Sequence, residues 1–327
     1  MCPETYERPD RAKPSIQLSI VVPVYYNEEN LPQTIPTLAQ IARQISGNAF
    51  ELIFVDDGSR DRSFEVLRRY QADPVHRLRI VKLTRNFGSM AAIQAGLAAA
   101  MGEVVGIIAA DLQDPPELFI EMHQQWQRGV KCIYAVRTNR EESFLKTLFA
   151  NTFYRLLRHY ALPGYPEGGF DFCLIDRQIV GQLVRIGEKN THVMNLIFWL
   201  GYPAVYIPYT RRSRTAGRSR WTLTKRLKLF TDSFVAFSYA PLRAVSVAGF
   251  VISLLAICYG AFQIYTRFFY GAPVRGFVTI VTLIALTSGM QMMMLGVLGE
   301  YLWRTLDATR TRPQFVVEQQ IEPPFHV

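Results

Sequence analysis

The 327-residue sequence predicts an α/β fold with a mostly parallel sheet, followed by a hairpin of two transmembrane helices. In the first half of the chain, short apolar runs alternate with helical patterns, as in a doubly wound parallel sheet. Polar and acidic motifs come directly after several of these runs. Near Tyr239 the sequence changes to two long apolar stretches, which indicates a separate helical region.

Four short apolar runs are predicted to be strands that are buried on both faces of the sheet. They are, in order, residues 18–24, 50–55, 78–83 and 104–109. Helical patterns follow the first three, to about residue 44, to about residue 71 and over 90–101. We expect a mobile N-terminal arm at 1–15 and a catalytic domain at 16–210. Ligands in such sheets bind at the carboxyl ends of the strands, so the functional site is expected there.

The stretches 244–266 and 276–299 are predicted to be transmembrane helices. They contain 23 and 24 residues without a charged residue or histidine. At roughly 1.5 Å per residue each helix is about 35 Å long, enough to cross a hydrocarbon core of about 30 Å. Tyrosine and tryptophan flank them, as at membrane interfaces (Tyr239, Tyr265, Tyr270, Tyr301 and Trp303). The alternative is a buried helical pair of a soluble protein.

The net charge of +9 is concentrated directly before the first apolar stretch. Eight basic residues and no acidic residue lie between Tyr209 and Asp232 (Arg211, Arg212, Arg214, Arg218, Arg220, Lys225, Arg226 and Lys228). Basic residues near a membrane attract anionic lipid by about 1 kcal/mol each. We therefore expect a lipid bilayer and no nucleic acid as the partner of this run. Residues 211–240 are predicted to form a juxtamembrane segment with an interfacial helix, the alternative being a solvated linker.

Charge asymmetry also predicts the membrane orientation. Basic residues precede the first apolar stretch and follow the second, whereas only Arg267 and Arg275 lie between them. By the positive-inside rule, the catalytic domain and both termini are expected in the cytosol, in a multi-pass protein of the inner (cytoplasmic) membrane. Residues 304–327 are expected to be a cytosolic tail. The four cysteines show no metal-like spacing, which agrees with a reducing compartment.

Two acidic motifs follow predicted strands. Asp56 and Asp57 come after the second strand, where a carboxylate pair can bind a base and a ribose, although a turn with a helix cap fits equally. Asp111 and Gln113 follow the fourth strand, and their oxygens suit a hard divalent cation that also binds a diphosphate. Asp114 is expected to cap a helix that begins at Pro115.

A third acidic site is Asp171, which lies between apolar residues after a pair of glycines. An aspartate in this setting is a candidate general base, and a structural aspartate that binds backbone amides is an equal alternative.

Taken together and in order, the motifs resemble family 2 glycosyltransferases with the GT-A Rossmann-like fold. The resemblance covers residues 16–317. More narrowly, the chain is similar to the membrane-anchored polyprenyl-phosphate glycosyltransferases, such as dolichol-phosphate mannose synthase and the bactoprenol glucosyltransferases. It is carried by VVPVYYNEEN, FVDDGSRD, LTRNFG, ADLQDPPE, DFCLIDR, RTAGRSRW, GVLGEYLWR and RPQF. It implies transfer of a sugar, with UDP-glucose as the first expected donor, to polyprenyl (undecaprenyl) phosphate at the cytosolic membrane face with inversion.

The resemblance also implies roles for individual residues. Nucleotide-sugar binding falls to Pro23, Tyr25, Glu28, Asp56, Asp57, Arg85 and Asp111; metal binding to Asp111 and Gln113; catalysis to Asp171; and acceptor-phosphate binding to Arg137, Arg214, Arg218 and Arg220. The implied cofactor is Mg²⁺ or Mn²⁺. Five glycines in the apolar stretches permit close helix packing, so a homo-oligomer is expected.

Three departures from the family pattern stand out. Ala109 replaces the first aspartate of the metal motif, Tyr26 is an additional aromatic residue in the nucleotide loop, and Cys173 stands where some relatives have arginine. Ala109 is the main support for a non-catalytic relative that binds nucleotide or lipid at a membrane. A processive polysaccharide synthase is the other alternative, but the glutamine expected before Arg220 and Trp221 is absent.

Overall fold

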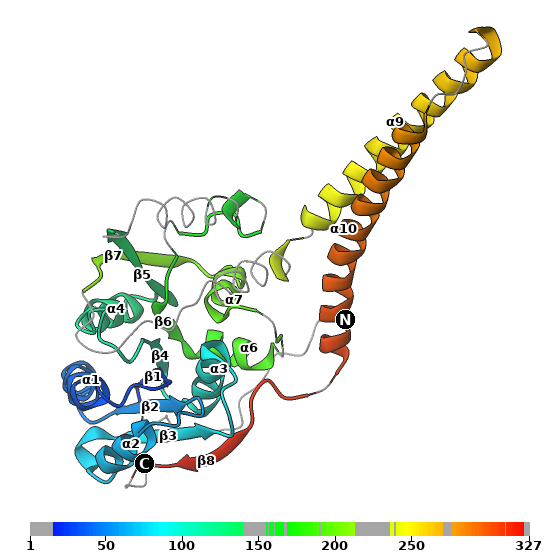
Figure 1. The fold of residues 1–327 in the computed structure, drawn as a ribbon. Helices are drawn as coiled ribbons and strands as arrows, with labels where there is room; N and C mark the ends of the chain where they lie inside the picture. The colour runs from blue at the N-terminus through cyan, green and yellow to red at the C-terminus, as the bar shows by residue number, and fades with distance from the viewer. Residues whose placement is uncertain are drawn as a thin grey trace, which may run out of the picture. The chain divides into compact units, whose positions relative to one another are not determined.

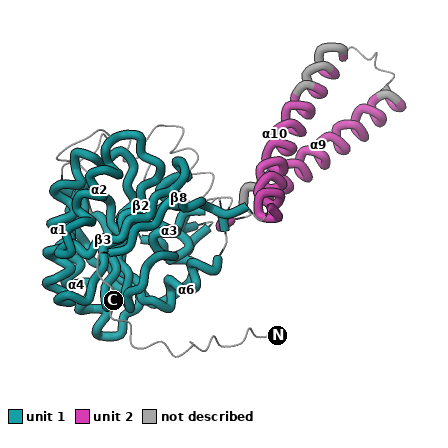
Figure 2. Tube along the Cα trace, turned by 90° about the horizontal axis from the view of Figure 1, so that it is seen from below, with its two compact units in different colours: residues 1–229, 312–327 teal, residues 230–311 magenta. Residues whose placement is uncertain are grey.

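The computed structural model describes residues 16–139, 155, 157–159, 161–166, 169–186, 188–189, 191–212, 236–238, 240–270, 276–310 and 312–323. The chain forms two compact units (Figure 2). Unit 1 comprises Met1–Leu229 together with Arg312–Val327, and unit 2 comprises Phe230–Thr311. The predicted arm at 1–15 and most of the predicted juxtamembrane segment lie outside the described residues.

Unit 1 is built on an eight-stranded sheet with the strand order β7-β5-β6-β4-β1-β2-β3-β8. The strands are β1 (Leu18–Val24), β2 (Phe50–Asp56), β3 (Leu78–Leu83), β4 (Val104–Ile107), β5 (Cys132–Asn139), β6 (Phe172–Asp176), β7 (Ala204–Thr210) and β8 (Val317–Ile321). The strands β1 to β4 pair in parallel, as do β5 and β7. This confirms the predicted mostly parallel α/β sheet.

Helices cover both faces of this sheet (Figure 1). One layer contains α1 (Leu31–Ser46), α2 (Ser63–Gln71) and α4 (Leu118–Gln127), and the other contains α3 (Ser89–Ala99), α6 (Arg177–Arg185) and α7 (Val193–Trp199). The stripe of α1 formed by Leu31, Ile35, Leu38 and Ala42 is fully buried, with the spacing of three and four that an amphipathic helix requires. Because both layers pack on the sheet, the central strands are buried almost along their whole length, and most of their side chains are apolar.

The antiparallel strand β6 brings a distant segment to the functional edge of the sheet. β6 runs opposite to both neighbours, with Ile107 of β4 beside Cys173 and Ala135 of β5 beside Phe172. The residue that precedes β6 therefore lies at the edge where β4 and β5 end. Asp171 is that residue, so it lies at the same edge as the loop after β4.

The last strand differs from the sequence expectation of a C-terminal tail at 304–327. After unit 2 the chain returns to unit 1 and adds β8 antiparallel to β3. Thr84 N donates to Val316 O at 3.0 Å, and Lys82 forms an ion pair with Glu318 at 3.0 Å. The sequence of β8 is mostly polar and its side chains are mostly exposed, so hydrophobic periodicity did not reveal it.

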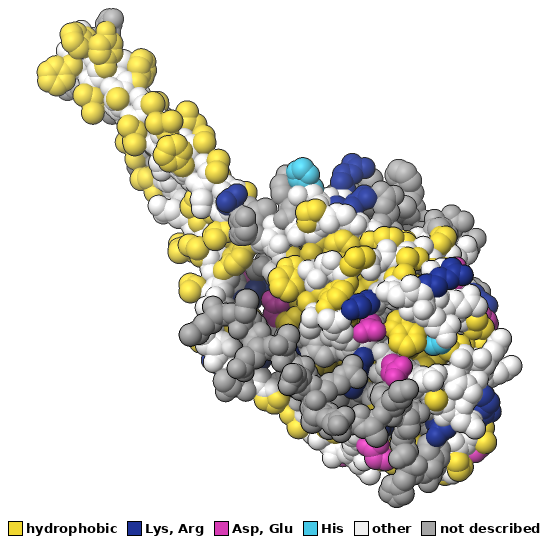
Figure 3. Space-filling view, turned by 180° about the vertical axis from the view of Figure 1, so that it is seen from behind, with side chains coloured by type: hydrophobic (Ala, Val, Ile, Leu, Met, Phe, Trp, Pro, Cys, Tyr) yellow, Lys and Arg dark blue, Asp and Glu magenta, His cyan; other side chains and the backbone are white. Residues whose placement is uncertain are grey.

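Unit 2 contains two long helices, α9 (Ala240–Tyr270) and α10 (Phe277–Thr309). Within the described residues, Leu242–Thr266 is long and apolar enough to cross a membrane, with a mean hydropathy of 2.2 and no burial of its most apolar window. Phe250 is 71% exposed and Ile257 68% exposed. Apolar side chains accordingly run along the face of the helical pair that Figure 3 shows.

This exposure argues against the alternative of a buried core pair, because a soluble core would cover these side chains. The two helices contact each other, and Gly249 of α9 leaves no room for a Cβ beside Met294 Cε of α10. Tyr301 Oη of α10 also donates to the carbonyl of Ser238, just before α9, at 2.9 Å. The second predicted span, 276–299, lies within this pair, and its passage through a membrane stays a prediction.

Candidate active site

Hydrogen bonds connect the nucleotide loop predicted after β1 to the loop after β2. Tyr26 N donates to Ser59 Oγ at 3.0 Å, and Arg62 N donates to Glu28 Oε2 at 2.8 Å. Tyr26 has a φ of 56°, which is uncommon for a residue other than glycine, and its hydrogen bond to Ser59 holds that conformation. Pro23 lies beyond Val21, the last residue of β1 that pairs with β4, so its missing N–H is tolerated there.

Asp57 connects the loop after β2 to the loop after β3 through two hydrogen bonds. Its two carboxylate oxygens accept hydrogen bonds from Phe87 N at 2.7 Å and Gly88 N at 2.9 Å. Burial raises the pKa of Asp57 to about 6, and these two amide bonds oppose part of that rise. Gly58 permits the close approach, because its φ is +67° and an added Cβ would lie 2.5 Å from the backbone carbon of Arg85.

Asp56 is fully buried at the end of β2. Its Oδ1 accepts a hydrogen bond from Ser59 N at 3.1 Å, and its Oδ2 has no hydrogen-bond partner in the described part of the chain. Burial raises the pKa of this carboxyl above its ordinary value. The assignment of Asp56 and Asp57 to a base and a ribose stays a prediction.

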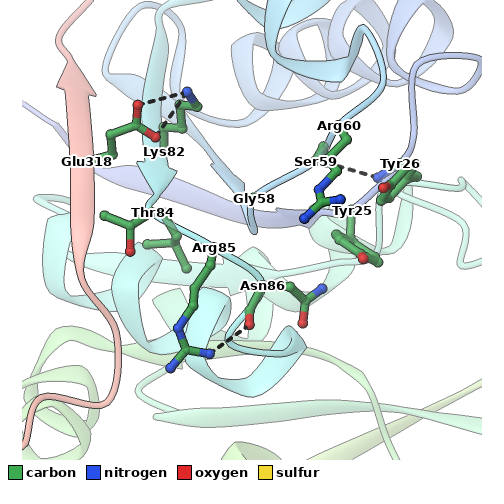
Figure 4. A pocket seen from close by; sticks show the side chains of 11 residues that line it. Tyr25, Tyr26, Gly58, Ser59, Arg60, Lys82, Thr84, Arg85, Asn86 and Glu318 are labelled. Carbon is green, nitrogen blue, oxygen red and sulfur yellow. Dashed lines mark hydrogen bonds and ion pairs between the residues drawn. The ribbon is translucent and has the colours of Figure 1, made fainter.

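A pocket of about 400 Å³ lies at the ends of β1, β2 and β3 and beside β8 (Figure 4). Its lining includes Tyr25, Ser59, Arg60, Lys82, Arg85 and Glu318. Two residues predicted to bind a nucleotide sugar, Tyr25 and Arg85, therefore share one cavity. With three basic side chains in its wall, the cavity suits an anionic ligand.

The loop after β4 carries the predicted metal motif. Leu112 has a φ of 51°, an uncommon conformation for this residue type, and Gln113 N donates to Asp111 Oδ1 at 3.3 Å. Gln113 also connects this loop to the end of β7, because its carbonyl accepts from Arg212 N at 2.9 Å and its side-chain amide donates to Arg212 O at 3.3 Å. The motif is thus held between two strands of the sheet.

A buried hydrogen-bonded network joins the ends of four strands. Tyr209 Oη donates to Asp114 Oδ1 at 2.5 Å and accepts from Arg137 Nε at 3.1 Å. Arg137 Nη2 donates to Asp171 Oδ2 at 2.6 Å. Asp114 is 1% exposed and also lies 3.6 Å from Arg211 Nε and 3.9 Å from Arg137 Nε. Arg137 therefore connects two carboxylates, one buried and one open to solvent.

The two carboxyls in this network titrate differently. Desolvation raises the pKa of Asp171, but the positive charges of Arg137, His192 and Arg211 outweigh it, so the pKa lies below its ordinary value. Burial raises the pKa of Asp114 above its ordinary value despite the nearby arginines. Asp171, whose side chain is half exposed, is thus ionised at neutral pH and accessible to a ligand.

Part of this network was not anticipated from the sequence. Asp114 was expected to cap the following helix, but α4 begins at Leu118 and Asp114 instead accepts the hydroxyl of Tyr209. Tyr209 and Arg211 carried no motif of their own, and only the position of Tyr209 near the end of a strand could have indicated its role. The predicted phosphate ligands Arg214, Arg218 and Arg220 lie outside the described residues.

Comparison with known proteins defines the family. Residues 19–184 match the model of the family "Glycosyl transferase family 2". The chain is 40% identical to the glycosyltransferase YkcC of Bacillus subtilis strain 168, over 93% of this chain and 94% of the relative. It is 32% identical to the prophage bactoprenol glucosyl transferase homolog of Escherichia coli K12, over 93% and 99% of the two chains. It is also 32% identical to the undecaprenyl-phosphate 4-deoxy-4-formamido-L-arabinose transferase of Pectobacterium atrosepticum, over 93% of each.

The chain belongs to glycosyl transferase family 2. It is a glycosyltransferase, and its mostly parallel sheet has the arrangement typical of the GT-A fold.

The Tyr209 hydroxyl is expected to stabilise the network, because its loss leaves Asp114 and Arg137 without a shared partner. Tyr209→Phe should lower the free energy of unfolding by about 1–3 kcal/mol, as for other buried groups that lose a hydrogen bond. Tyr206→Phe is the matched control, since Tyr206 lies on the same strand with 45% of its surface exposed. Urea unfolding of the full chain in mild detergent measures both, and equal effects of the two substitutions would contradict this role of Tyr209.

Proposed function

We propose that this glycosyltransferase transfers a sugar from a nucleoside diphosphate to the phosphate of a polyprenyl lipid, with undecaprenyl phosphate as acceptor. The observation that carries the proposal is the ion pair between Asp171 and Arg137, at 2.6 Å, at the sheet edge where the predicted metal motif also lies. Two relatives whose names contain bactoprenol or undecaprenyl phosphate support this acceptor.

On the donor side, the pocket beside β8 is the proposed nucleotide site. Arg60, Lys82 and Arg85 supply positive charge for the diphosphate, and Tyr25 offers an aromatic face. The relatives differ in the sugar that their names give, a glucosyl group in one and a formamido-arabinose in another. UDP-glucose is the proposed donor, on the strength of the bactoprenol glucosyl transferase homolog.

On the acceptor side, the phosphate oxygen is already anionic near neutral pH, so its attack requires no strong base. Asp171, with its lowered pKa, is a weak base that suits orientation of the phosphate or removal of a residual proton. A carboxylate repels a phosphate, and Arg137 offsets this repulsion. Its Nη1 nitrogen makes no hydrogen bond to any described residue, so the guanidinium retains a donor for a phosphate oxygen. Attack from the face opposite the leaving diphosphate inverts the sugar.

A divalent cation, Mg²⁺ or Mn²⁺, fits the residues after β4. No cluster of three acidic, histidine or cysteine residues suits a metal among the described residues. Such hard cations, however, take one or two protein carboxylates and complete their shell with substrate phosphates and water. Asp111 is the proposed ligand, with Gln113 beside it, and the absence of a carboxylate at Ala109 makes the site dependent on the diphosphate. The bound cation would offset the charge that develops on the leaving group.

The order of the chain supports a membrane hairpin. The strand β7 precedes α9 and β8 follows α10, yet both strands belong to one sheet. If α9 crosses a membrane, the chain must cross back before β8, and α10 with its 33 residues is long enough to do so. Unit 1 would then lie on one side, which we propose is the cytosolic face of the cytoplasmic membrane. A homo-oligomer remains a proposal that follows from the glycines of the two helices.

The proposed reaction is tested with labelled UDP-glucose, UDP-N-acetylglucosamine and GDP-mannose, each supplied with undecaprenyl phosphate. The wild-type protein should form labelled lipid from UDP-glucose. Asp171→Asn should lower kcat by at least about 100-fold while its Kd for UDP stays within about threefold, because general-base and orienting groups act mainly on the reaction step. Asp73→Asn, the same substitution in an exposed turn, should retain full activity.

Labelled lipid from another donor would change the sugar and leave the reaction class intact. Binding of UDP without labelled lipid from any donor would contradict the transferase and favour a non-catalytic binding protein.

Metal dependence is tested by the affinity for UDP rather than by activity. In the wild type, Mg²⁺ or Mn²⁺ should tighten UDP binding relative to EDTA. In Asp111→Asn the metal-dependent gain in UDP affinity should fall by roughly tenfold or more, because the only proposed carboxylate ligand is lost. Calorimetric titration with and without metal measures the effect. The same metal-dependent gain in Asp111→Asn and wild type would exclude Asp111 as a ligand.

A further inference from the structure

Glu318 is the only acidic side chain that lines the pocket beside β8, as far as the described residues extend. The two aspartates expected to bind a base and a ribose do not line it. Asp57 is buried, and both of its carboxylate oxygens accept hydrogen bonds from backbone amides. Asp56 is fully buried at the end of β2. The carboxylate that the pocket offers to a ligand thus comes from β8, after the apolar helices in sequence.

The position of Glu318 is fixed by Lys82. The Lys82 ammonium contacts both carboxylate oxygens, at 3.1 Å and 3.0 Å, across the wall formed by β3 and β8 (Figure 4). Lys82 is itself restrained, because its Nζ lies 4.8 Å from the centre of the Phe64 ring. Each oxygen of an ionised carboxylate accepts about two hydrogen bonds, so Glu318 keeps acceptor capacity while paired. Its side chain is 49% exposed and therefore accessible.

Docking of β8 does not depend on this pair. Beyond the pocket, Glu322 forms an ion pair with Arg79 at 3.0 Å, and Arg79 also binds the buried Glu51 at 3.1 Å. Gln71 Nε2 donates to the carbonyl of Glu322 at 2.7 Å, and the backbone ladder with β3 adds further bonds. An exposed pair such as Lys82 and Glu318 contributes little to stability by itself. Its place in the pocket points instead to a role in binding.

We propose that the Glu318 carboxylate accepts a hydrogen bond from the nucleoside of the sugar donor, from a ribose hydroxyl or a base N–H, with Lys82 as its positioning residue. This inference rests on the proposed donor site. An acidic side chain that binds a ribose hydroxyl is an established solution in other nucleotide-binding sheets. Lys82 offsets the repulsion between Glu318 and the diphosphate. The C-terminal segment thereby contributes to donor recognition as well as to the sheet.

The experiment compares the Kd for UDP of the full-length wild type, Glu318→Ala and Glu322→Ala, at constant Mg²⁺ and ionic strength. Without contact, loss of a negative charge beside an anionic ligand should tighten binding. With contact, Glu318→Ala should weaken UDP binding by roughly tenfold or more, as expected for a hydrogen bond to a charged group. Glu322→Ala, which removes the ion pair of β8 outside the pocket, should stay within about twofold of the wild type.

A second arm uses 2′-deoxy-UDP to locate the hydrogen-bond donor. If Glu318 binds the 2′-hydroxyl, removal of the hydroxyl and Glu318→Ala should not have additive effects on affinity. Additive effects would indicate another hydroxyl or a base N–H, and both results support the inference.

Unchanged or tighter UDP binding by Glu318→Ala would overturn the inference. An equal loss in Glu322→Ala would also overturn it, because docking of β8 rather than contact would explain the change. A wild-type protein that binds neither UDP nor GDP would contradict the proposed donor site itself, which is a distinct result.

Discussion

The site depends on one guanidinium, that of Arg137, which lies between two carboxylates. Arg137 donates to Asp171 at 2.6 Å and to Tyr209 at 3.1 Å, and Tyr209 in turn donates to the buried Asp114. Without this positive charge, Asp114 and Asp171 would repel each other, since the charge of Asp171 raises the pKa of Asp114. Removal of one partner from a buried ionic network is strongly destabilising, so the position of Asp171 and the ends of the surrounding strands depend on Arg137.

The strand order divides this edge of the sheet into two halves. The pocket lies at the ends of β1, β2 and β3 beside β8, whereas the Arg137 network lies at the ends of β4, β5 and β7 and before β6. Two antiparallel strands are essential to this arrangement, because β6 places Asp171 and β8 places Glu318. The loop with Asp111 follows β4, which pairs with β1 and β6 at the boundary between the halves. With the donor bound in one half and the acceptor in the other, a cation held by the loop with Asp111 would lie between them.

The sequence was sufficient for the parallel core and for the positions of the motifs. Strands such as β2 are buried and mostly apolar and end in acidic residues, so the apolar runs and the turn chemistry identified them. The Asp114–Tyr209–Arg137 contacts were not predictable, because they join residues 23 to 95 positions apart through strand pairings that a single sequence does not specify. β8 was missed for a different reason: an exposed, polar edge strand lacks the alternation on which strand prediction depends.

The central claim is that Arg137 keeps Asp171 ionised and in position for transfer. The most direct test is the pH dependence of kcat for sugar transfer, at saturating donor and acceptor, in the wild type and in Arg137→Gln. The acceptor phosphate titrates in the same way with both proteins, so a difference between the two pH profiles comes from a group of the protein. The acid limb is expected to move to higher pH in Arg137→Gln, because the pKa of Asp171 rises when the neighbouring positive charge is removed. A lower rate with an unchanged acid limb would contradict it.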